Sequence, residues 1–131
     1  PPLFQRVVAR IHDVNAVTIY GGRTELMFMN AGDHVGSTAL MYAAESNQLD
    51  VVISLMNHPR IDLNVQVRDI NFTALHLAVS YNHPAIVSQL LSDDKIDASL
   101  KDKYNCTALK MAIDRGHAEC VTILRQHGAP E

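Results

Sequence analysis

The chain has 131 residues, 47% of them hydrophobic and 19% charged, which suits one domain with a single core. The formal net charge is -3 and no stripe of lysines and arginines could neutralise a phosphate backbone, so nucleic acid is not expected as the primary partner. No apolar run approaches the roughly 20 residues that span a bilayer, and no polybasic tract is present, so no membrane partner is expected either.

Cysteine usage indicates the compartment. Cys106 and Cys120 are too few for a disulfide framework, and the first residues lack the basic flank and apolar block of a signal peptide. We therefore expect a reducing compartment, the cytoplasm or the nucleus. A monomer is expected rather than a homo-oligomer.

The N-terminal segment predicts one amphipathic helix. Apolar residues recur at i, i+4 and i+8 within residues 3–11, and basic residues lie on the other side. The following Asp13-Val14-Asn15 recurs later as Asp62-Leu63-Asn64. Residues 3–15 are therefore interpreted as a partial repeat, the second half of a unit whose first half is missing.

An insertion follows at residues 16–32. Residues 16–20 and 23–29 are rich in β-branched and apolar side chains, and Gly21-Gly22 between them can adopt the positive φ angles of a two-residue turn. We predict an extended β-hairpin, with a partly disordered loop as the alternative. Met27, Phe28 and Met29 form a second candidate surface, covered either by the rest of the chain or by a partner.

One segment then occurs three times. Thr73-Ala74-Leu75-His76-Leu77-Ala78 is matched 35 residues earlier by Thr38-Ala39-Leu40 and 34 residues later by Thr107-Ala108-Leu109. A period of this length indicates copies of one supersecondary unit, because each copy buries its apolar face on the next. Together they make residues 1–131 a single repeat domain. The three full copies are placed at residues 33–67, 68–101 and 102–131.

Each copy predicts two helices. In the first copy, Thr38 can cap a helix that runs to about Asn47, and a second helix runs from about Asp50 to Asn57. Asparagine tolerates the left-handed conformation of a helix exit, and Asn82 and Gly116 occupy the position of Asn47 in the later copies. The alanines after each threonine are small enough to let neighbouring copies lie close together.

These residues resemble the ankyrin repeat. Thr73 to Ala78 matches its Thr-x-Leu-His start of the first helix, Asn82-His83 stands for its Gly-His, and residues 86–91 for its second helix. The resemblance covers residues 3–15 and 33–131. It implies an all-α solenoid of stacked helix-turn-helix units with β-hairpin turns, beside the extended hairpin insert.

The copies also depart from this pattern. Met41 and Lys110 replace the motif histidine, so the threonine–histidine hydrogen bonding of the family is expected to be weaker in the first and third copies. Stability is therefore expected to be uneven along the stack.

No pattern in the sequence supports catalysis or metal binding. Cys-x-x-Cys and His-x-x-x-His spacings, a glycine-rich phosphate loop and a Gly-x-Ser-x-Gly elbow are all missing. His76, His83 and His117 occupy positions where the repeat itself uses histidine. Cys106 would need an adjacent base, and the sequence nominates none. We expect no enzyme, no catalytic residue, no metal and no cofactor.

The resemblance implies a protein-binding surface, because the turns and the ends of the first helices line the concave groove in ankyrin-like proteins. The positions not required for packing lie four, three and one residues before each threonine, and seven and eight after it. The first copy supplies His34, Val35, Ser37, Glu45 and Ser46 there. The later copies supply Cys106 and the residues taken as candidate binding residues, which are Asp69, Ile70, Phe72, Ser80, Tyr81, Lys103, Tyr104, Asp114 and Arg115.

Aromatic side chains and arginine often dominate interface energy. Phe72, Tyr81 and Tyr104 belong to this set, from a chain with four tyrosines, three phenylalanines and no tryptophan. The alternative for Phe72 and Tyr104 is packing on the neighbouring turn. On the binding interpretation, alanine at all three positions is expected to abolish binding with little change in melting temperature.

The sequence thus predicts a non-catalytic protein–protein interaction module that binds one partner through its concave face and turn tips. The alternative is a structural or regulatory ankyrin segment of a longer multidomain protein, such as an inhibitor of a transcription factor. The partial first repeat at residues 3–15 motivates this alternative. The identity of the partner and the pathway do not follow from the sequence.

Overall fold

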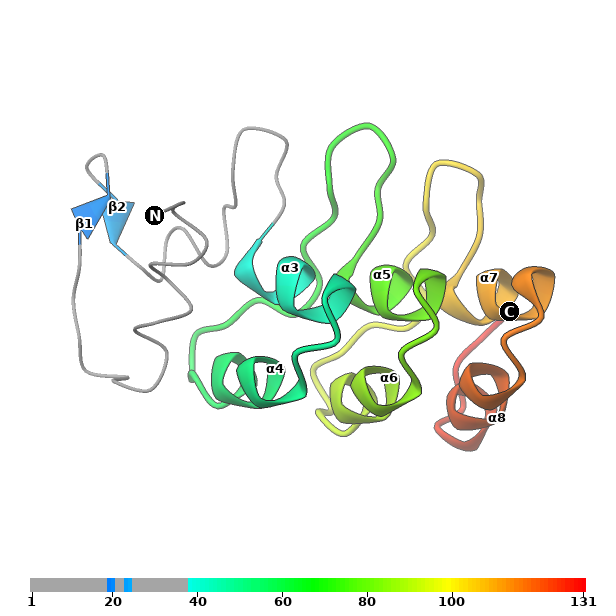
Figure 1. The fold of residues 1–131 in the computed structure, drawn as a ribbon. Helices are drawn as coiled ribbons and strands as arrows, with labels where there is room; N and C mark the ends of the chain where they lie inside the picture. The colour runs from blue at the N-terminus through cyan, green and yellow to red at the C-terminus, as the bar shows by residue number, and fades with distance from the viewer. Residues whose placement is uncertain (1–18, 21–22, 25–37) are drawn as a thin grey trace.

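A computed structural model describes residues 19–20, 23–24 and 38–131. Within these residues, two short strands precede three pairs of helices. In Figure 1, α3, α5 and α7 form one row and α4, α6 and α8 a second row, with a long turn projecting ahead of each of α5 and α7. The elements are β1 (Ile19–Tyr20), β2 (Arg23–Thr24), α3 (Ala39–Glu45), α4 (Leu49–Met56), α5 (Ala74–Ser80), α6 (Pro84–Leu91), α7 (Ala108–Arg115) and α8 (Ala118–Gln126).

The two strands pair as the predicted hairpin requires. β1 and β2 are antiparallel, with Ile19 opposite Thr24 and Tyr20 opposite Arg23, so the residues on either side of Gly21-Gly22 lie opposite each other. The remainder of the predicted insert lies outside the described residues. So do the partial repeat at 3–15 and the candidate surface of Met27, Phe28 and Met29.

Each first helix begins at a threonine. The hydroxyls of Thr38, Thr73 and Thr107 accept a hydrogen bond from the backbone N–H three residues further on, at 3.1–3.2 Å. This satisfies one of the N–H groups that a helix start leaves without an intrahelical partner, which contributes about 1 kcal/mol per cap. The threonines therefore fix where α3, α5 and α7 begin, as the sequence predicted.

The exits of the same helices are also as predicted. Asn47 and Asn82 each have φ of 56° and Gly116 has φ of 70°, all in the left-handed region. The predicted second helix of the first copy is observed one residue earlier, as Leu49–Met56. Pro84 is the first residue of α6, where its missing N–H costs no intrahelical bond.

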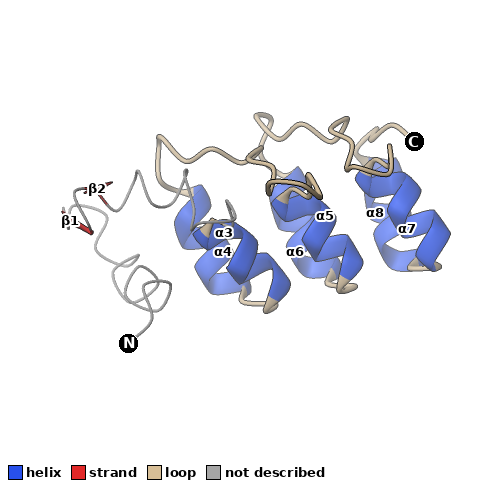
Figure 2. Cartoon of the chain, turned by 90° about the horizontal axis from the view of Figure 1, so that it is seen from above, coloured by secondary structure: helices blue, strands red, loops and turns tan. Residues whose placement is uncertain are grey.

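The core lies between the two helical rows and between successive pairs. α3 packs against α5 and α5 against α7, while α4 packs against α6 and α6 against α8. Seen from above in Figure 2, the three pairs stand side by side. The alanines that were predicted to allow close approach are at most 1% exposed: Ala39, Ala43, Ala44, Ala74, Ala78, Ala108 and Ala112.

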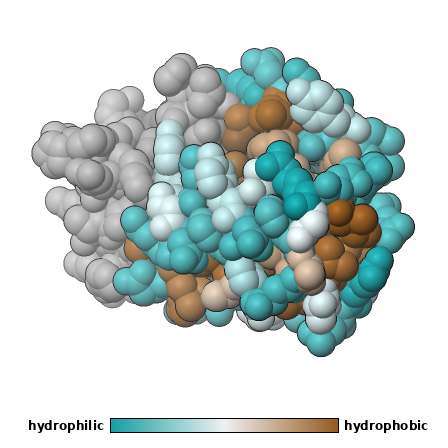
Figure 3. Space-filling view, turned by 45° about the vertical axis from the view of Figure 1, so that its right-hand side comes forward, coloured by the Kyte–Doolittle hydropathy of each residue, from teal (hydrophilic) through white to brown (hydrophobic). Residues whose placement is uncertain are grey.

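The last pair leaves apolar surface open. Ile113 of α7 is 39% exposed, whereas Val79 occupies the same position of α5 and is fully buried against the following pair. Figure 3, which brings this end of the stack forward, shows apolar residues at the surface there.

Candidate protein-interaction face

The projecting turns are joined to each other. We call residues 65–72 the second finger and residues 99–106 the third finger. The backbone N–H of Lys103 donates to the carbonyl oxygen of Ile70 at 2.9 Å, and the Gln66 amide donates to the carbonyl oxygens of Asn71 and Lys101, each at 3.0 Å. The two fingers therefore form one surface. We use the term finger face for this surface and the exposed sides of α3, α5 and α7 taken together.

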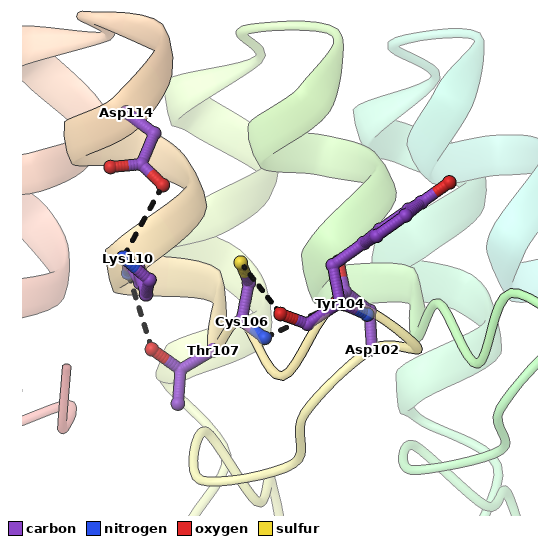
Figure 4. A network of polar contacts seen from close by, with 6 residues as sticks. All are labelled: Asp102, Tyr104, Cys106, Thr107, Lys110 and Asp114. Atoms are coloured by element: carbon purple, nitrogen blue, oxygen red, sulfur yellow. Dashed lines mark hydrogen bonds and ion pairs between the residues drawn. The ribbon is translucent and has the colours of Figure 1, made fainter.

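The third finger is shaped by a buried carboxylate. Asp102 is 7% exposed and accepts hydrogen bonds from the backbone N–H groups of Tyr104 at 2.8 Å and Cys106 at 3.0 Å (Figure 4). Asn105 adopts φ of 63° at the turn. Sequence reasoning did not nominate Asp102, although an aspartate that begins a tight turn is a recognisable signal for such bonds.

His76 links two repeats. Its Nδ1 lies 2.9 Å from the Thr73 hydroxyl, and its Nε2 donates to the carbonyl oxygen of Cys106 at 2.9 Å. Burial lowers the pKa of this imidazole, opposed in part by the Cys106 hydrogen bond and by Asp102. The tautomer with Nε2 protonated follows, because the carbonyl can only accept.

The first and third copies lack this link, as the sequence predicted. Met41 replaces the histidine in the first copy, and its sulfur lies 3.5 Å from the backbone nitrogen of Thr38. Lys110 replaces it in the third copy, where its ammonium pairs with Asp114 at 3.6 Å instead. The bonding between threonine and imidazole is therefore confined to the second copy among the described residues.

Tyr81 is exposed and yet held on two sides. It is 51% exposed, and the Glu45 carboxylate that faces its hydroxyl raises the pKa of the tyrosine while the charge of Arg115 lowers it. Its ring stacks on His83 with 6.3 Å between centroids and 12° between planes. His83 in turn donates from Nε2 to the carbonyl oxygen of Glu45 at 3.0 Å. This group joins the C-terminal ends of α3 and α5.

Tyr104 is the most exposed large hydrophobic residue that the structure describes, at 65%. The Lys103 ammonium lies 5.3 Å from the centroid of its ring, within the range of a cation–π contact. Figure 4 shows the ring extending from the third finger away from α7. Tyr104 therefore offers a large, accessible contact surface.

Phe72 is placed differently from the two tyrosines. It is partly buried, packs against the core, and stacks on His76 with 5.7 Å between centroids and 4° between planes. Packing, the alternative considered for this residue, thus accounts for much of its surface. The expectation that alanine at Phe72 would leave the melting temperature unchanged is corrected on this ground.

Some of the other candidate residues are engaged in contacts, and others are exposed to solvent. Asp69 is exposed with φ of 68°, Ile70 and Ser80 are half-buried, and Arg115 is exposed. Asp114 is engaged by Lys110, as described above. Of the positions in the first copy, His34, Val35 and Ser37 lie outside the described residues. Only the structure shows that Glu45 belongs with Tyr81, because the two are 36 positions apart in the sequence.

The described part of the chain also bears on metal binding and on thiol reactivity. Within it, no three histidine, cysteine or acidic side chains gather as metal ligands. Burial raises the pKa of the Cys120 thiol, which disfavours the reactive thiolate. No helix among the described residues is long and apolar enough to cross a membrane.

The fold and this surface define a class: a solenoid of stacked helical pairs that presents fingers and first helices on one face. Comparison with known families agrees. A family model described as ankyrin repeats in three copies matches residues 65–130, and a model for a single ankyrin repeat matches residues 35–65. The chain belongs to the ankyrin repeat family.

Individual relatives include the SMC5-SMC6 complex localization factor protein 1 of Bos taurus, 36% identical over 95 residues, and that of Homo sapiens, 35% identical. Each match covers 72% of this chain and 9% of the relative. The putative ankyrin repeat protein YahD of Escherichia coli K12 is 32% identical over 121 residues, which cover 89% of this chain and 52% of that protein. The chain therefore spans about half or much less of these relatives.

Ankyrin repeats are generally protein–protein interaction modules, and the family is typically non-enzymatic. Membership thus supports the general type of function that the sequence predicted.

Proposed function

We propose that this chain is a non-catalytic module that binds a protein partner through the finger face. The observation that carries the proposal is the state of Tyr81, whose side chain is 51% exposed although its ring is stacked on His83, which is itself hydrogen-bonded to the carbonyl oxygen of Glu45. An exposed aromatic side chain that is already held in place loses little conformational freedom on binding. Such residues are typical anchors of protein interfaces.

The fingers support the same mechanism. The hydrogen bonds from Lys103 to Ile70 and from Gln66 to both fingers join the second and third fingers before any partner arrives. A partner would therefore meet a preformed surface, with Tyr104 at the tip and Tyr81 at the helix ends. Much of the ordering entropy would already have been lost on folding.

The test compares Tyr81→Ala/Tyr104→Ala with the wild type and with Ile53→Ala. Ile53 is 38% exposed on α4, in the other helical row, and so provides a matched loss of exposed apolar surface. Quantitative affinity capture from cells, followed by binding assays with the purified captured protein, should show a partner lost in the double variant and kept by Ile53→Ala. A partner that the double variant retains at wild-type affinity would refute the finger face as the site.

A second candidate is a structural or regulatory segment of a longer multidomain protein, including an inhibitor of a transcription factor. It is supported by the share of the relatives that the chain spans, only 9% for the two localization factors. An antibody raised against the chain tests it, because this candidate requires an endogenous protein much larger than 131 residues. A band at the size of the chain alone would contradict it.

We also propose a monomer in a reducing compartment, the cytoplasm or the nucleus. The free thiols of Cys106 and Cys120 support the compartment. Light scattering of the purified chain tests the oligomeric state, and microscopy of the endogenous protein tests the location. A dimer, or secretion, would count against the respective proposal.

A further inference from the structure

The charges of the last two repeats separate by element. Residues 65–81 and 99–115, which form the fingers and first helices, contain five basic and three acidic residues. Residues 82–98 and 116–131, which form the second helices and the loops after them, contain two basic and five acidic residues. One of the three acidic residues on the finger side, Asp102, is buried. In these two repeats the finger side is therefore positive and the opposite side negative, while α3 of the first repeat adds one acidic residue, Glu45, to the finger side.

Three cations on the finger side are open to solvent. Lys101, Lys103 and Arg115 are exposed, and none of them forms an ion pair with another residue of the described ranges. Lys110 differs, since its ammonium pairs with Asp114 at 3.6 Å. Unpaired cations at the rim of an interface attract and orient an oppositely charged partner.

On the finger face, Tyr104 lies beside one of these cations, and the charge of another acts on Tyr81. The Lys103 ammonium is 5.3 Å from the Tyr104 ring centroid, and the positive charge of Arg115 acts on the Tyr81 hydroxyl. Glu45 also faces Tyr81, and its negative charge opposes a second carboxylate there. A carboxylate next to an apolar side chain could therefore contact a cation and a ring together at Tyr104, whereas Tyr81 offers its ring to an apolar side chain.

We infer that the finger face recognises a linear acidic segment of its protein partner, with aspartate or glutamate against Lys101, Lys103 and Arg115 and an apolar side chain against Tyr81 or Tyr104. This inference rests on the proposed function and adds the chemistry of the partner. The negative opposite side would repel the same segment, so the charges also select which side of the stack is bound.

A phage-displayed random-peptide library, selected on the wild-type chain, tests the inference. Enriched peptides are synthesised and their Kd is measured for the wild type, for Lys101→Glu/Lys103→Glu, and for the control Lys95→Glu/Arg125→Glu, whose exposed cations lie on the negative side. We expect peptides rich in aspartate and glutamate, weakened at least about tenfold by the finger variant and little by the control. Binding should also weaken as the ionic strength rises from about 0.05 M to about 0.5 M.

The other outcomes separate this inference from the proposed function. Neutral or basic peptides that tolerate the finger variant but are lost in Tyr81→Ala/Tyr104→Ala would overturn the acidic partner and leave the finger face as the site. Peptides that tolerate both variants would overturn both proposals. Failure to enrich any peptide would overturn the linear acidic segment. The inference would also be overturned if no acidic peptide were enriched and a single-stranded DNA probe bound in a way that depends on Lys101 and Lys103. These cations would then be assigned to nucleic acid. Circular dichroism verifies that every variant is folded.

Discussion

The imidazole of His76 in the second repeat donates from Nε2 to the main-chain oxygen of Cys106 in the third finger, at 2.9 Å. The same ring meets the Thr73 hydroxyl at 2.9 Å and is only 1% exposed. One side chain thus connects the cap of α5 to the finger that carries Tyr104. We therefore expect the stability of the finger face to depend on His76, although this residue is almost entirely withdrawn from solvent.

Acid is expected to weaken this connection. Burial lowers the pKa of His76 below the value of about 6.5 that is usual for a histidine, so the unfolded chain binds a proton more readily than the folded chain. The contribution of neutral His76 is therefore complete above about pH 6.5 and is lost as the pH falls from there towards the lowered folded pKa. Urea unfolding at pH 7.5 and at about pH 5 measures the loss.

Four other histidines lie in the described helical region, so the pH effect must be assigned by a variant. His76→Gln keeps a polar side chain but has no group that titrates near pH 6, and its stability should fall less than that of the wild type over the same interval. An identical pH dependence in the two proteins would show that His76 is not the responsible group.

Asp102 is expected to determine the order of the third finger. Its carboxylate accepts from two backbone N–H groups, and Asp102→Ala would leave both donors without that acceptor, at a cost of about 1–3 kcal/mol in unfolding free energy. Amide hydrogen exchange should accelerate at Tyr104 and Cys106. The control is Asp94→Ala, since Asp94 is exposed and lies outside both fingers, so its loss should cost about 0.5 kcal/mol or less. Unchanged exchange at both amides would contradict this role of Asp102.

Phe72 and Tyr104 are expected to respond oppositely to alanine. Phe72 packs on the core and on His76, so its truncation should lower the unfolding free energy by about 1–3 kcal/mol, less than for a fully buried phenylalanine. Tyr104 is 65% exposed, so its truncation should change stability by about 0.5 kcal/mol or less while weakening partner binding. Equal destabilisation by the two substitutions would contradict the difference in packing.

Most of the fold could be predicted from the repeat pattern, because interactions between residues close in the sequence determine where the helices begin and end. Thr38, Thr73 and Thr107 cap helices through bonds to residues three positions away, and Asn47 and Asn82 end helices through their own φ angles. Interactions of such short range can be read from the order of residues.

The organisation of the finger face could be predicted only in part. The candidate positions were found by counting from each threonine, but their partners depend on how one repeat is placed on the next. Glu45 and Tyr81 meet across α3 and α5, and His76 meets Cys106 across the fingers. The separation of charge was not predicted for the same reason. Segments with more basic residues and segments with more acidic residues alternate along the chain, and they lie on different sides of the molecule only when the repeats stack.

Gly116 allows a test of the left-handed backbone conformation that the helix exit requires. It adopts φ of 70°, and a Cβ atom added there would meet nothing within 4 Å, so Gly116→Ala introduces conformational strain without a clash. We expect a loss of about 1 kcal/mol in unfolding free energy, measured by urea titration. Gly116→Asn should cost less, because Asn47 and Asn82 already adopt φ of 56° at the equivalent exits. If alanine and asparagine were equally costly, the tolerance of asparagine for the left-handed region would not explain its use at the other two exits.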